Sequence, residues 1–282
     1  MAIQLVPVGS QEKSIGADFS ARSADLAAFG ERASPVVTLD HFRISAPVFG
    51  PHPHAGFSAV SYVLEDSPGS LRSRDTLGND IVMGPGGIVW SQAGSGMMHE
   101  EVPAETGREL RGFQIFVNLS SKNKSVAPRV FALAAGEVPE WRSGSGDRVR
   151  VVVGSFEGLS SPLVPAEAFD LFDVELRREI SFDLKVGCNA LVYVLAGEVV
   201  AGAGAQQEKV AREHALALHS GHGRATFGSP DGARFLILSG ADIREPVVTN
   251  GPFIMNDASQ IDAALARYRA GTMGRLAPLS ES

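Results

Sequence analysis

Two short motifs, His52-x-His54 and His99-x-Glu101, contain the residues whose types and spacing best suit metal binding or catalysis. Side chains two apart on a β-strand point to the same face of a sheet. If the two motifs lie on strands that face each other across a barrel, three imidazoles and one carboxylate converge on one point. Pro53 suits the start of such a strand, because it has no N–H to lose from the ladder.

This set of nitrogen and oxygen ligands suits iron(II), manganese, nickel, copper or zinc better than calcium or magnesium. An octahedral metal with four protein ligands keeps two positions for water, substrate or O₂. The alternative is that the residues are surface or core histidines satisfied by hydrogen bonds, which a lone His-x-His pair does not exclude. The matching period of the second pair favours the metal site, so we predict that His52, His54, His99 and Glu101 are metal ligands.

The composition is that of a globular protein, with 44% hydrophobic and 20% charged residues in 282. A net charge of −7 argues against nucleic-acid binding, because few basic groups are left to neutralise phosphates. The lone Cys188 excludes an internal disulfide framework and fits a reducing compartment, where we expect an inert thiol. The sequence shows neither a signal peptide nor a long apolar run, so we expect a cytoplasmic protein without a membrane anchor.

Glycine and proline, 31 and 16 residues, interrupt the chain every few positions and separate short β-rich runs such as 36–39, 59–64 and 112–117. Many short strands with frequent turns indicate an all-β barrel or sandwich. A second strand-rich block runs from about 149 to 239, after a Ser-, Ala- and Gly-rich connector at 120–146. The run at 192–198 resembles the run at 61–65, which suggests two copies of one barrel.

The second copy has no His-x-His before its repeated strand. Its histidines, His214, His219 and His222, lie in a Gly- and Ala-rich section and are more typical of loop or surface positions than of a second metal site. We therefore predict a metal-binding barrel in residues 1–134 and a metal-free barrel in 135–282. The second domain also includes a short helix at 256–268, with Ile261, Leu265 and Tyr268 at helical spacing.

Several motifs together resemble the pirins, which are bicupins with two antiparallel β-barrels in tandem. The shared residues are His52-Pro53-His54 with Gly56-Phe57, Tyr62–Glu65, Arg74–Asn79, Gly84–Gly86, Ala93-Gly94 with Gly96, His99-x-Glu101, and the C-terminal Glu245–Val248 and Gly251–Asn256. The resemblance implies iron in the N-terminal barrel, held by the residues that match His52, His54, His99 and Glu101. It also implies a C-terminal barrel without metal.

Four residues near the motifs depart from the family pattern. Ala55 stands where pirins have arginine, Ser58-Ala59 where they have Glu-Thr, and Ser95 where they have another arginine. Residues around metal ligands tune metal affinity and ligand basicity. The departures therefore bear on the choice of metal and on activity more than on the fold.

The resemblance implies two classes of function. The first is an O₂-dependent dioxygenase of the quercetin 2,3-dioxygenase type, acting on a flavonol or similar enolic aromatic, with Glu101 as the base for the substrate hydroxyl. Strand alternation points Glu100 away from the site. The apolar residues near the motifs are candidates for the wall of an aromatic pocket or for ordinary core: Phe57, Val89, Trp90, Met97 and Met98.

The second class is a non-enzymatic iron- or redox-dependent regulatory module that binds a protein partner. A metal-dependent isomerase or sugar-processing cupin is a weaker third possibility, because the expected lining has few groups for a polyhydroxylated substrate. We favour the enzyme, with a small aromatic substrate and O₂ as its partners and Fe(II) as its metal, and we expect a monomer.

Overall fold

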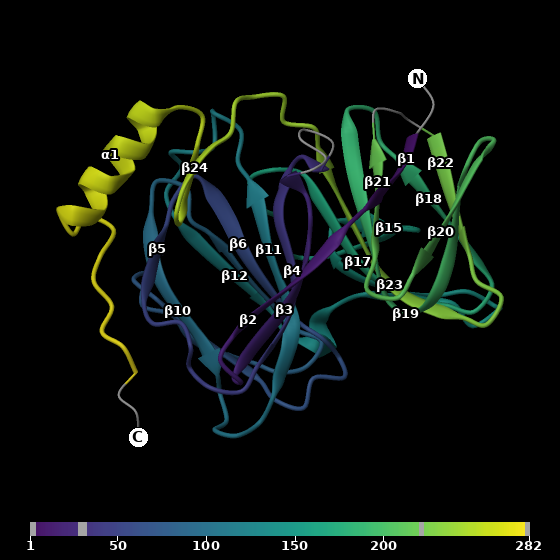
Figure 1. Ribbon diagram of the computed structural model, residues 1–282, viewed down its shortest axis with the longest axis horizontal. Helices are drawn as coiled ribbons and strands as arrows, with labels where there is room; N and C mark the ends of the chain where they lie inside the picture. Colours follow the sequence, from purple (N-terminus) through teal and green to yellow (C-terminus); the bar gives the residue numbers. More distant parts are fainter. Residues whose placement is uncertain (1–3, 28–32, 220–222, 280–282) are drawn as a thin grey trace. The chain divides into compact units, whose positions relative to one another are not determined.

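The computed structural model describes residues 4–27, 33–219 and 223–279, and almost all of its regular structure is β-strand (Figure 1). The described residues form two compact units. We call the first the N-terminal barrel unit, which takes residues from 12–21, 38–135 and 244–282. The second, the C-terminal barrel unit, takes residues from 1–11, 22–37 and 136–243. The predicted all-β bicupin fold with a short C-terminal helix is confirmed.

The N-terminal barrel unit is organised around two sheets. The larger has the strand order β12-β9-β6-β11-β4-β3-β2 and the smaller β5-β10-β7-β8. Side chains that alternate inward from both sheets form an apolar core that includes Phe42, Val63, Leu71, Val89 and Leu110. The strands are β2 (Ser10–Ile15), β3 (Phe19–Ala24), β4 (Val36–Ile44), β5 (His52–His54), β6 (Phe57–Val63), β7 (Leu71–Asp75), β8 (Asp80–Met83), β9 (Ile88–Gln92), β10 (Met97–Pro103), β11 (Leu110–Asn118) and β12 (Arg129–Leu133).

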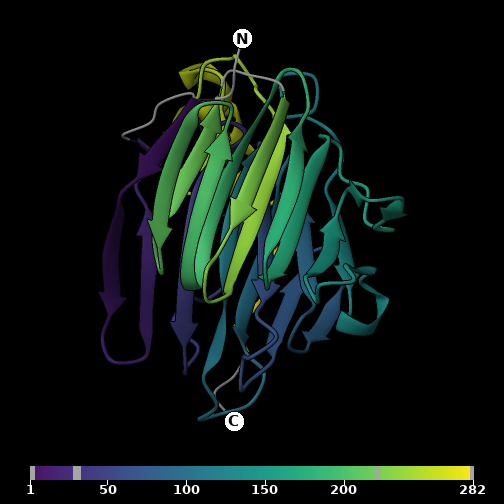
Figure 2. The ribbon, with the colours of Figure 1, turned by 90° about the vertical axis from the view of Figure 1, so that its right-hand side faces the viewer.

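The C-terminal barrel unit has a ten-stranded sheet, part of which faces the viewer in Figure 2. Its main path is β1-β21-β19-β23-β17-β14-β13, and β18, β20 and β22 close the barrel through pairs with each other and with β19. Phenylalanine, valine and leucine side chains fill its interior. The strands are β1 (Gln4–Val8), β13 (Glu140–Arg142), β14 (Arg148–Val153), β15 (Ser155–Phe156), β16 (Leu159–Ser160), β17 (Phe169–Leu176), β18 (Glu179–Leu184), β19 (Cys188–Ala203), β20 (Gln206–Ala211), β21 (Ala215–His219), β22 (Gly223–Gly228) and β23 (Ala233–Ala241).

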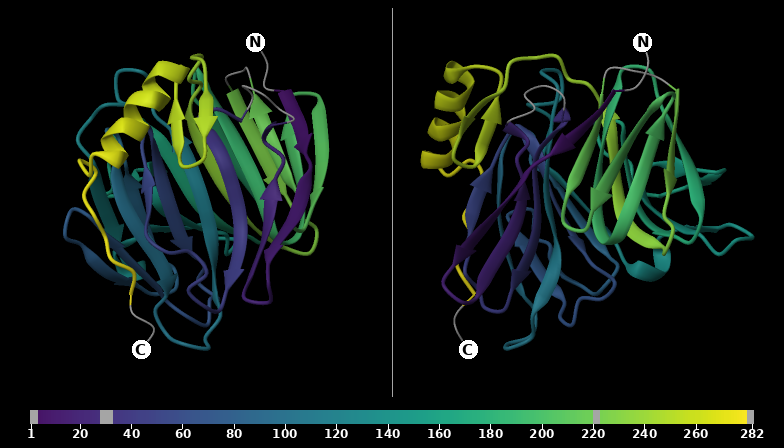
Figure 3. Two further views of the ribbon diagram at one scale, coloured as in Figure 1. Left: turned by 60° about the vertical axis from the view of Figure 1, so that its left-hand side comes forward. Right: turned by 45° about the vertical axis from the view of Figure 1, so that its right-hand side comes forward.

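The units are not consecutive halves of the chain, which differs from the expected division at residues 134 and 135. Strand β1 pairs antiparallel with β21, from Gln4 opposite His219 to Val8 opposite Ala215. The C-terminal segment, with the β24 (Val248–Asn250) and β25 (Phe253–Met255) hairpin and helix α1 (Ala258–Arg269), belongs instead to the N-terminal barrel unit (Figure 3). Strand pairing between distant segments decides membership of a unit, and the local sequence pattern does not reveal it.

Helix α1 begins at its N-cap Asp257, whose carboxylate accepts a hydrogen bond from the Gln260 N–H. It buries Ile261 and Ala264, whereas Tyr268, expected on the packed face, is 39% exposed. No helix among the described residues is both long and apolar enough to span a membrane.

The expected connector at 120–146 is more ordered than its composition suggests. Strand β12 within it pairs with β9 along Arg129–Leu133, and β13 pairs with β14 along Glu140–Arg142. Between them lies one short 3₁₀ turn at Ala135–Glu137. The boundary between the two units, between 135 and 136, falls at this turn.

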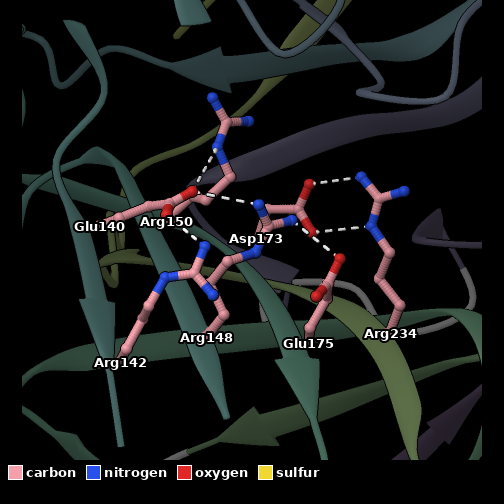
Figure 4. A network of polar contacts seen from close by, with 7 residues as sticks. All are labelled: Glu140, Arg142, Arg148, Arg150, Asp173, Glu175 and Arg234. Carbon is pink, nitrogen blue, oxygen red and sulfur yellow. Dashed lines mark hydrogen bonds and ion pairs between the residues drawn. The ribbon is translucent and has the colours of Figure 1, made fainter. Parts of the chain in front are cut away.

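Four neighbouring strands of the C-terminal barrel unit carry a network of seven charged side chains (Figure 4). Opposite charges face each other across the strand pairs, as in Arg148 opposite Glu175 and Glu175 opposite Arg234. Arg234 binds the buried Asp173 through two hydrogen bonds of 3.1 and 2.7 Å. The network also joins Arg148 to Glu140 at 3.1 Å.

We expect the buried and exposed ends of this network to differ in their effect on stability. Replacing Asp173 with alanine leaves the Arg234 guanidinium without its bidentate partner and should lower the free energy of unfolding by about 3 kcal/mol. Arg142→Ala removes a partner of Glu140 that is 62% exposed and should change stability by less than about 0.5 kcal/mol. Denaturant unfolding measures both, and equal effects would contradict this assignment.

Candidate metal centre

The three histidines of the two motifs lie on adjacent strands. Strand β10 pairs antiparallel with β5, so that His99 lies opposite His52 and Met97 lies opposite His54. The two motifs therefore do not face each other across the barrel, which was the arrangement considered for their convergence. They meet because β5 and β10 are hydrogen-bonded neighbours and because alternation turns all three imidazoles to one face.

The three imidazoles form a compact cluster. The ring centroids of His52 and His54 are 4.7 Å apart, and each is 4.6 Å from that of His99. One ring nitrogen from each histidine lies within 4.8 Å of the others. Among the described residues this is the one group of three or more potential ligands so placed.

The spacing of the nitrogen atoms fits a transition metal. The Nε2 atoms of His52 and His99 are 3.1 Å apart. Two imidazole nitrogens that bind one metal at about 2.1 Å and at a right angle lie about 3.0 Å from each other. The cluster therefore has the donor type and the spacing that a divalent transition metal requires.

Burial keeps the imidazoles of His54 and His99 neutral, which is the form that binds metals. Burial, helped by the nearby His52, lowers the pKa of His54 to about 3, although a hydrogen bond to the Pro252 backbone opposes the shift. Burial also holds the pKa of His99 well below its ordinary value, with smaller contributions from His54 and His52. The Nδ1 atom of His52 lies 2.8 Å from the Gly50 carbonyl oxygen. This contact favours a proton on Nδ1 and leaves Nε2 with a free lone pair.

Glu101 faces the same cavity but stands outside the histidine cluster. Its Oε2 accepts a hydrogen bond of 2.6 Å from the Ser61 hydroxyl. Burial raises the pKa of Glu101 to about 7, while hydrogen bonds from Ser61 and Ser73 oppose the shift. Its assignment as a fourth ligand and as a base stays a prediction.

The histidine cluster opens into a cavity of about 480 Å³ within the N-terminal barrel unit. Both sheets contribute to its wall, and most of the lining is apolar or aromatic. The apolar residues are Phe19, Phe42, Ile44, Val48, Phe49, Leu71, Leu110 and Phe116. Such a volume and lining suit a small, largely apolar ligand.

For the apolar residues near the motifs, the sequence left two alternatives, the pocket wall and ordinary core, and the structure shows the second. Phe57, Val89, Trp90, Met97 and Met98 are all at most 8% exposed, and none lines the cavity. They are core residues. The wall comes instead from the loop directly before β5 and from β3, β4 and β11, of which β3 and β11 are distant from the histidines in the sequence.

Three polar residues of the lining escaped the sequence analysis. Ser61 lies on β6, Gln114 on β11 and Asp40 on β4, which are successive strands of the larger sheet. Each lies an even number of positions from inward-facing apolar residues of its own strand, as Asp40 does from Phe42 and Ile44, so its side chain faces the same side. This two-residue spacing is visible in the sequence and could have identified all three residues.

A buried ammonium group fixes the segment that follows His54. Lys124, which is 3% exposed, donates hydrogen bonds to the Gly56 and Ile254 carbonyl oxygens, both at 3.0 Å, and to Asn118 Oδ1 at 2.7 Å. Gly56 has a φ of +84°, and a Cβ there would lie 2.0 Å from the Ile254 oxygen. Only glycine therefore fits this turn between β5 and β6.

The C-terminal segment after α1 runs beside β5 and β10 (Figure 1), and it contacts residues of β7 and β10 and the residue after β7. Thr76 Oγ1 donates to the Met273 carbonyl at 2.9 Å, and Arg74 donates to that of Ala277 at 2.8 Å. Glu100 points outward, as predicted, where it pairs with Arg74 and accepts a bond from the Leu279 N–H at 3.3 Å. The strand that carries His99 and Glu101 is thus held from its outer side.

The histidines of the C-terminal barrel unit bind protein oxygens. The ring Nδ1 of His214 lies 2.9 Å from the Arg212 carbonyl oxygen, and that of His219 lies 2.8 Å from Asn189 Oδ1. His222 lies outside the described residues. Burial raises the pKa of the Cys188 thiol, which fits the expected inert role.

The fold and the site define the class of the protein as a bicupin with a candidate metal centre in one barrel. A family model described as Pirin matches residues 14–117, and one described as Pirin C-terminal cupin domain matches residues 171–274. The chain therefore belongs to the pirin family, as its motifs predicted.

Named relatives agree with this assignment, and a solved structure agrees with the fold. A Pseudomonas aeruginosa protein whose name assigns it provisionally to the quercetin 2,3-dioxygenases is 34% identical over 255 residues, which cover 86% of this chain and 88% of that protein. Human pirin is 32% identical, with coverage of 85% and 83%. The crystal structure of a quercetin 2,3-dioxygenase from Acinetobacter baumannii has a TM-score of 0.84 at 24% identity and covers 98% of this chain and 99% of that one.

The Lys124 ammonium group should matter for metal binding without touching the metal. Lys124→Met would leave the carbonyl groups of Gly56 and Ile254 without their donor and would loosen the turn after His54. We expect metal affinity to fall by roughly tenfold and the free energy of unfolding by about 2 kcal/mol. The exposed Lys122→Met serves as the control. Equal metal affinity in both variants, measured by competition with a chromogenic chelator, would show that the turn does not need this anchor.

Proposed function

We propose that this pirin-family protein is a metal-dependent dioxygenase of the quercetin 2,3-dioxygenase type, which acts on a flavonol or a similar planar enolic aromatic. The observation that carries the proposal is the opening of the three-imidazole cluster into an apolar cavity of about 480 Å³. The relatives named as quercetin 2,3-dioxygenases add support from similarity. A dioxygenase adds both atoms of O₂ to its substrate and therefore needs no separate reductant.

His52, His54 and His99 would hold the metal, with Glu101 as the fourth ligand that we predict. Fe(II) is our first choice, and manganese, nickel, copper and zinc are the other metals that suit this donor set. When bound, such a metal would favour loss of the proton from an enolic hydroxyl and promote reaction of the substrate with O₂.

The residues of the chain would prepare the substrate for that reaction. The apolar wall excludes water and fits a flat ring system, and the Phe19 and Phe49 rings pack edge to face with centroids 5.0 Å apart in this lining. Glu101 offers a carboxylate oxygen inside the cavity that can accept the enolic proton. The Ser61 hydroxyl fixes the orientation of that carboxylate through its bond to Oε2.

Activity is tested by loading the protein with iron(II) under nitrogen, adding quercetin and then admitting O₂. We expect one O₂ consumed for each quercetin oxidised. His54→Ala should abolish turnover together with bound metal, and Glu101→Gln should lower the rate by a factor of about 10² or more. If none of the five divalent metals supports product formation in the unmodified protein, the dioxygenase proposal fails.

A second candidate is a metal-dependent regulatory module, which the contacts of the C-terminal segment favour. Leu279 binds Glu100, and the neighbours of Glu100 on β10 are His99 and Glu101. A change of metal state could therefore alter a surface that a protein partner reads.

Hydrogen exchange tests this second candidate. Metal loading should slow the exchange of backbone amides at 273–279 relative to those of helix α1. Identical exchange in metal-free and metal-loaded protein would remove the link between the metal centre and this surface.

A further inference from the structure

The metal cavity contains a second carboxylate, Asp40, on the sheet opposite the histidines. His52, His54, His99 and Glu101 belong to the smaller sheet, whereas Asp40 lies on β4 of the larger one. Asp40, Phe42 and Ile44 alternate along β4 and all line the cavity. Strand alternation therefore turns the Asp40 side chain toward the space that a substrate would occupy.

The neighbouring polar groups of the larger sheet are already bonded to the protein. The Ser61 hydroxyl donates to Glu101 and lies 3.2 Å from Gln114 Oε1, and Gln114 Nε2 donates to the Val60 carbonyl at 3.2 Å. Asp40 differs from them. Across the described part of the chain, no residue donates a hydrogen bond to its carboxylate or forms an ion pair with it.

A half-buried carboxylate beside Phe42 and Ile44 loses water without gaining a protein donor. Such a group costs stability in the empty cavity, and a ligand that brings a donor to it removes that cost. An unpaired aspartate on the wall of a cavity is better explained as a group that binds a ligand than as part of the core.

We propose that Asp40 is a specificity-determining residue that accepts a hydrogen bond from a hydroxyl group on the part of the ligand remote from the metal. This inference rests on the proposed function, since it takes the ligand to be a planar enolic aromatic held at the histidines. It narrows the substrate class to aromatics with a second hydroxyl that can reach the larger sheet. Related compounds without that hydroxyl leave the carboxylate unpaired and are rejected.

The test compares two ligands that share one metal-binding edge. Quercetin and 3-hydroxyflavone both carry a hydroxyl beside a carbonyl, but only quercetin has further hydroxyls. Binding to the zinc-loaded protein is measured by fluorescence titration under nitrogen, so that no oxidation occurs. We expect the unmodified protein to bind quercetin at least about tenfold more tightly than 3-hydroxyflavone, because hydrogen bonds to charged groups have this magnitude.

In Asp40→Leu, the affinity for quercetin should exceed that for 3-hydroxyflavone by no more than about twofold. Comparing this affinity ratio between the variant and the unmodified protein removes the contribution of the different hydrophobicity of the two ligands. Asp40→Asn keeps the shape of the side chain and should reduce the preference to an intermediate value, so it tests the proposal even if the leucine variant folds poorly. Arg43→Gln, on the outward face of the same strand, is the control. An undiminished preference in Asp40→Leu or Asp40→Asn overturns the inference.

The outcomes separate this inference from the proposed function. A preference that depends on Asp40, in a protein that never oxidises either ligand, supports the inference and removes the dioxygenase. If quercetin is oxidised but the preference does not depend on Asp40, the dioxygenase proposal is supported and the inference about Asp40 fails. Failure of the zinc-loaded protein to bind either ligand overturns the inference.

Discussion

The antiparallel pairing of β5 with β10 is the constraint on which the candidate metal centre depends. In the observed register, His99 lies opposite His52, and all three imidazoles share one face. A shift of one residue would turn Met98 and Glu100 inward and carry His99 to the outer side of the sheet. Bonds on both sides oppose such a shift: Lys124 fixes the turn after His54, and Arg74, Glu100 and the C-terminal segment fix the outer face.

The two sheets of the N-terminal barrel unit contribute different parts of the cavity. The smaller sheet supplies the histidines and Glu101, and the larger sheet supplies most of the apolar wall together with Ser61, Gln114 and Asp40. A ligand in the cavity would therefore meet the metal-binding groups on one sheet and the groups that distinguish ligands on the other. This arrangement lets the substrate range change through β4 and β11 without any change at the histidines.

The sequence predicted those features that depend on local periodicity. The two-residue spacing of His52 and His54 predicted that their imidazoles share one face, and the turns between short apolar runs predicted the all-β fold. Features that depend on contacts between distant segments were missed. Phe57 and Trp90 are close to the motifs in sequence but face the core, whereas Phe19 and Phe116 reach the cavity from distant strands. The pairing of β1 with β21 is a similar case, because nothing in the first residues indicates which barrel they join.

The central claim is that one divalent metal lies among His52, His54 and His99. Anomalous diffraction from crystals of protein purified without added metal, recorded on either side of the iron absorption edge, tests it most directly. We predict a single strong peak in the N-terminal barrel unit, about 2.1 Å from a ring nitrogen of each histidine. We expect no comparable peak in the C-terminal barrel unit. A metal bound elsewhere, or three imidazoles that stay without a metal after soaking with iron(II), nickel(II) or zinc(II), would contradict it.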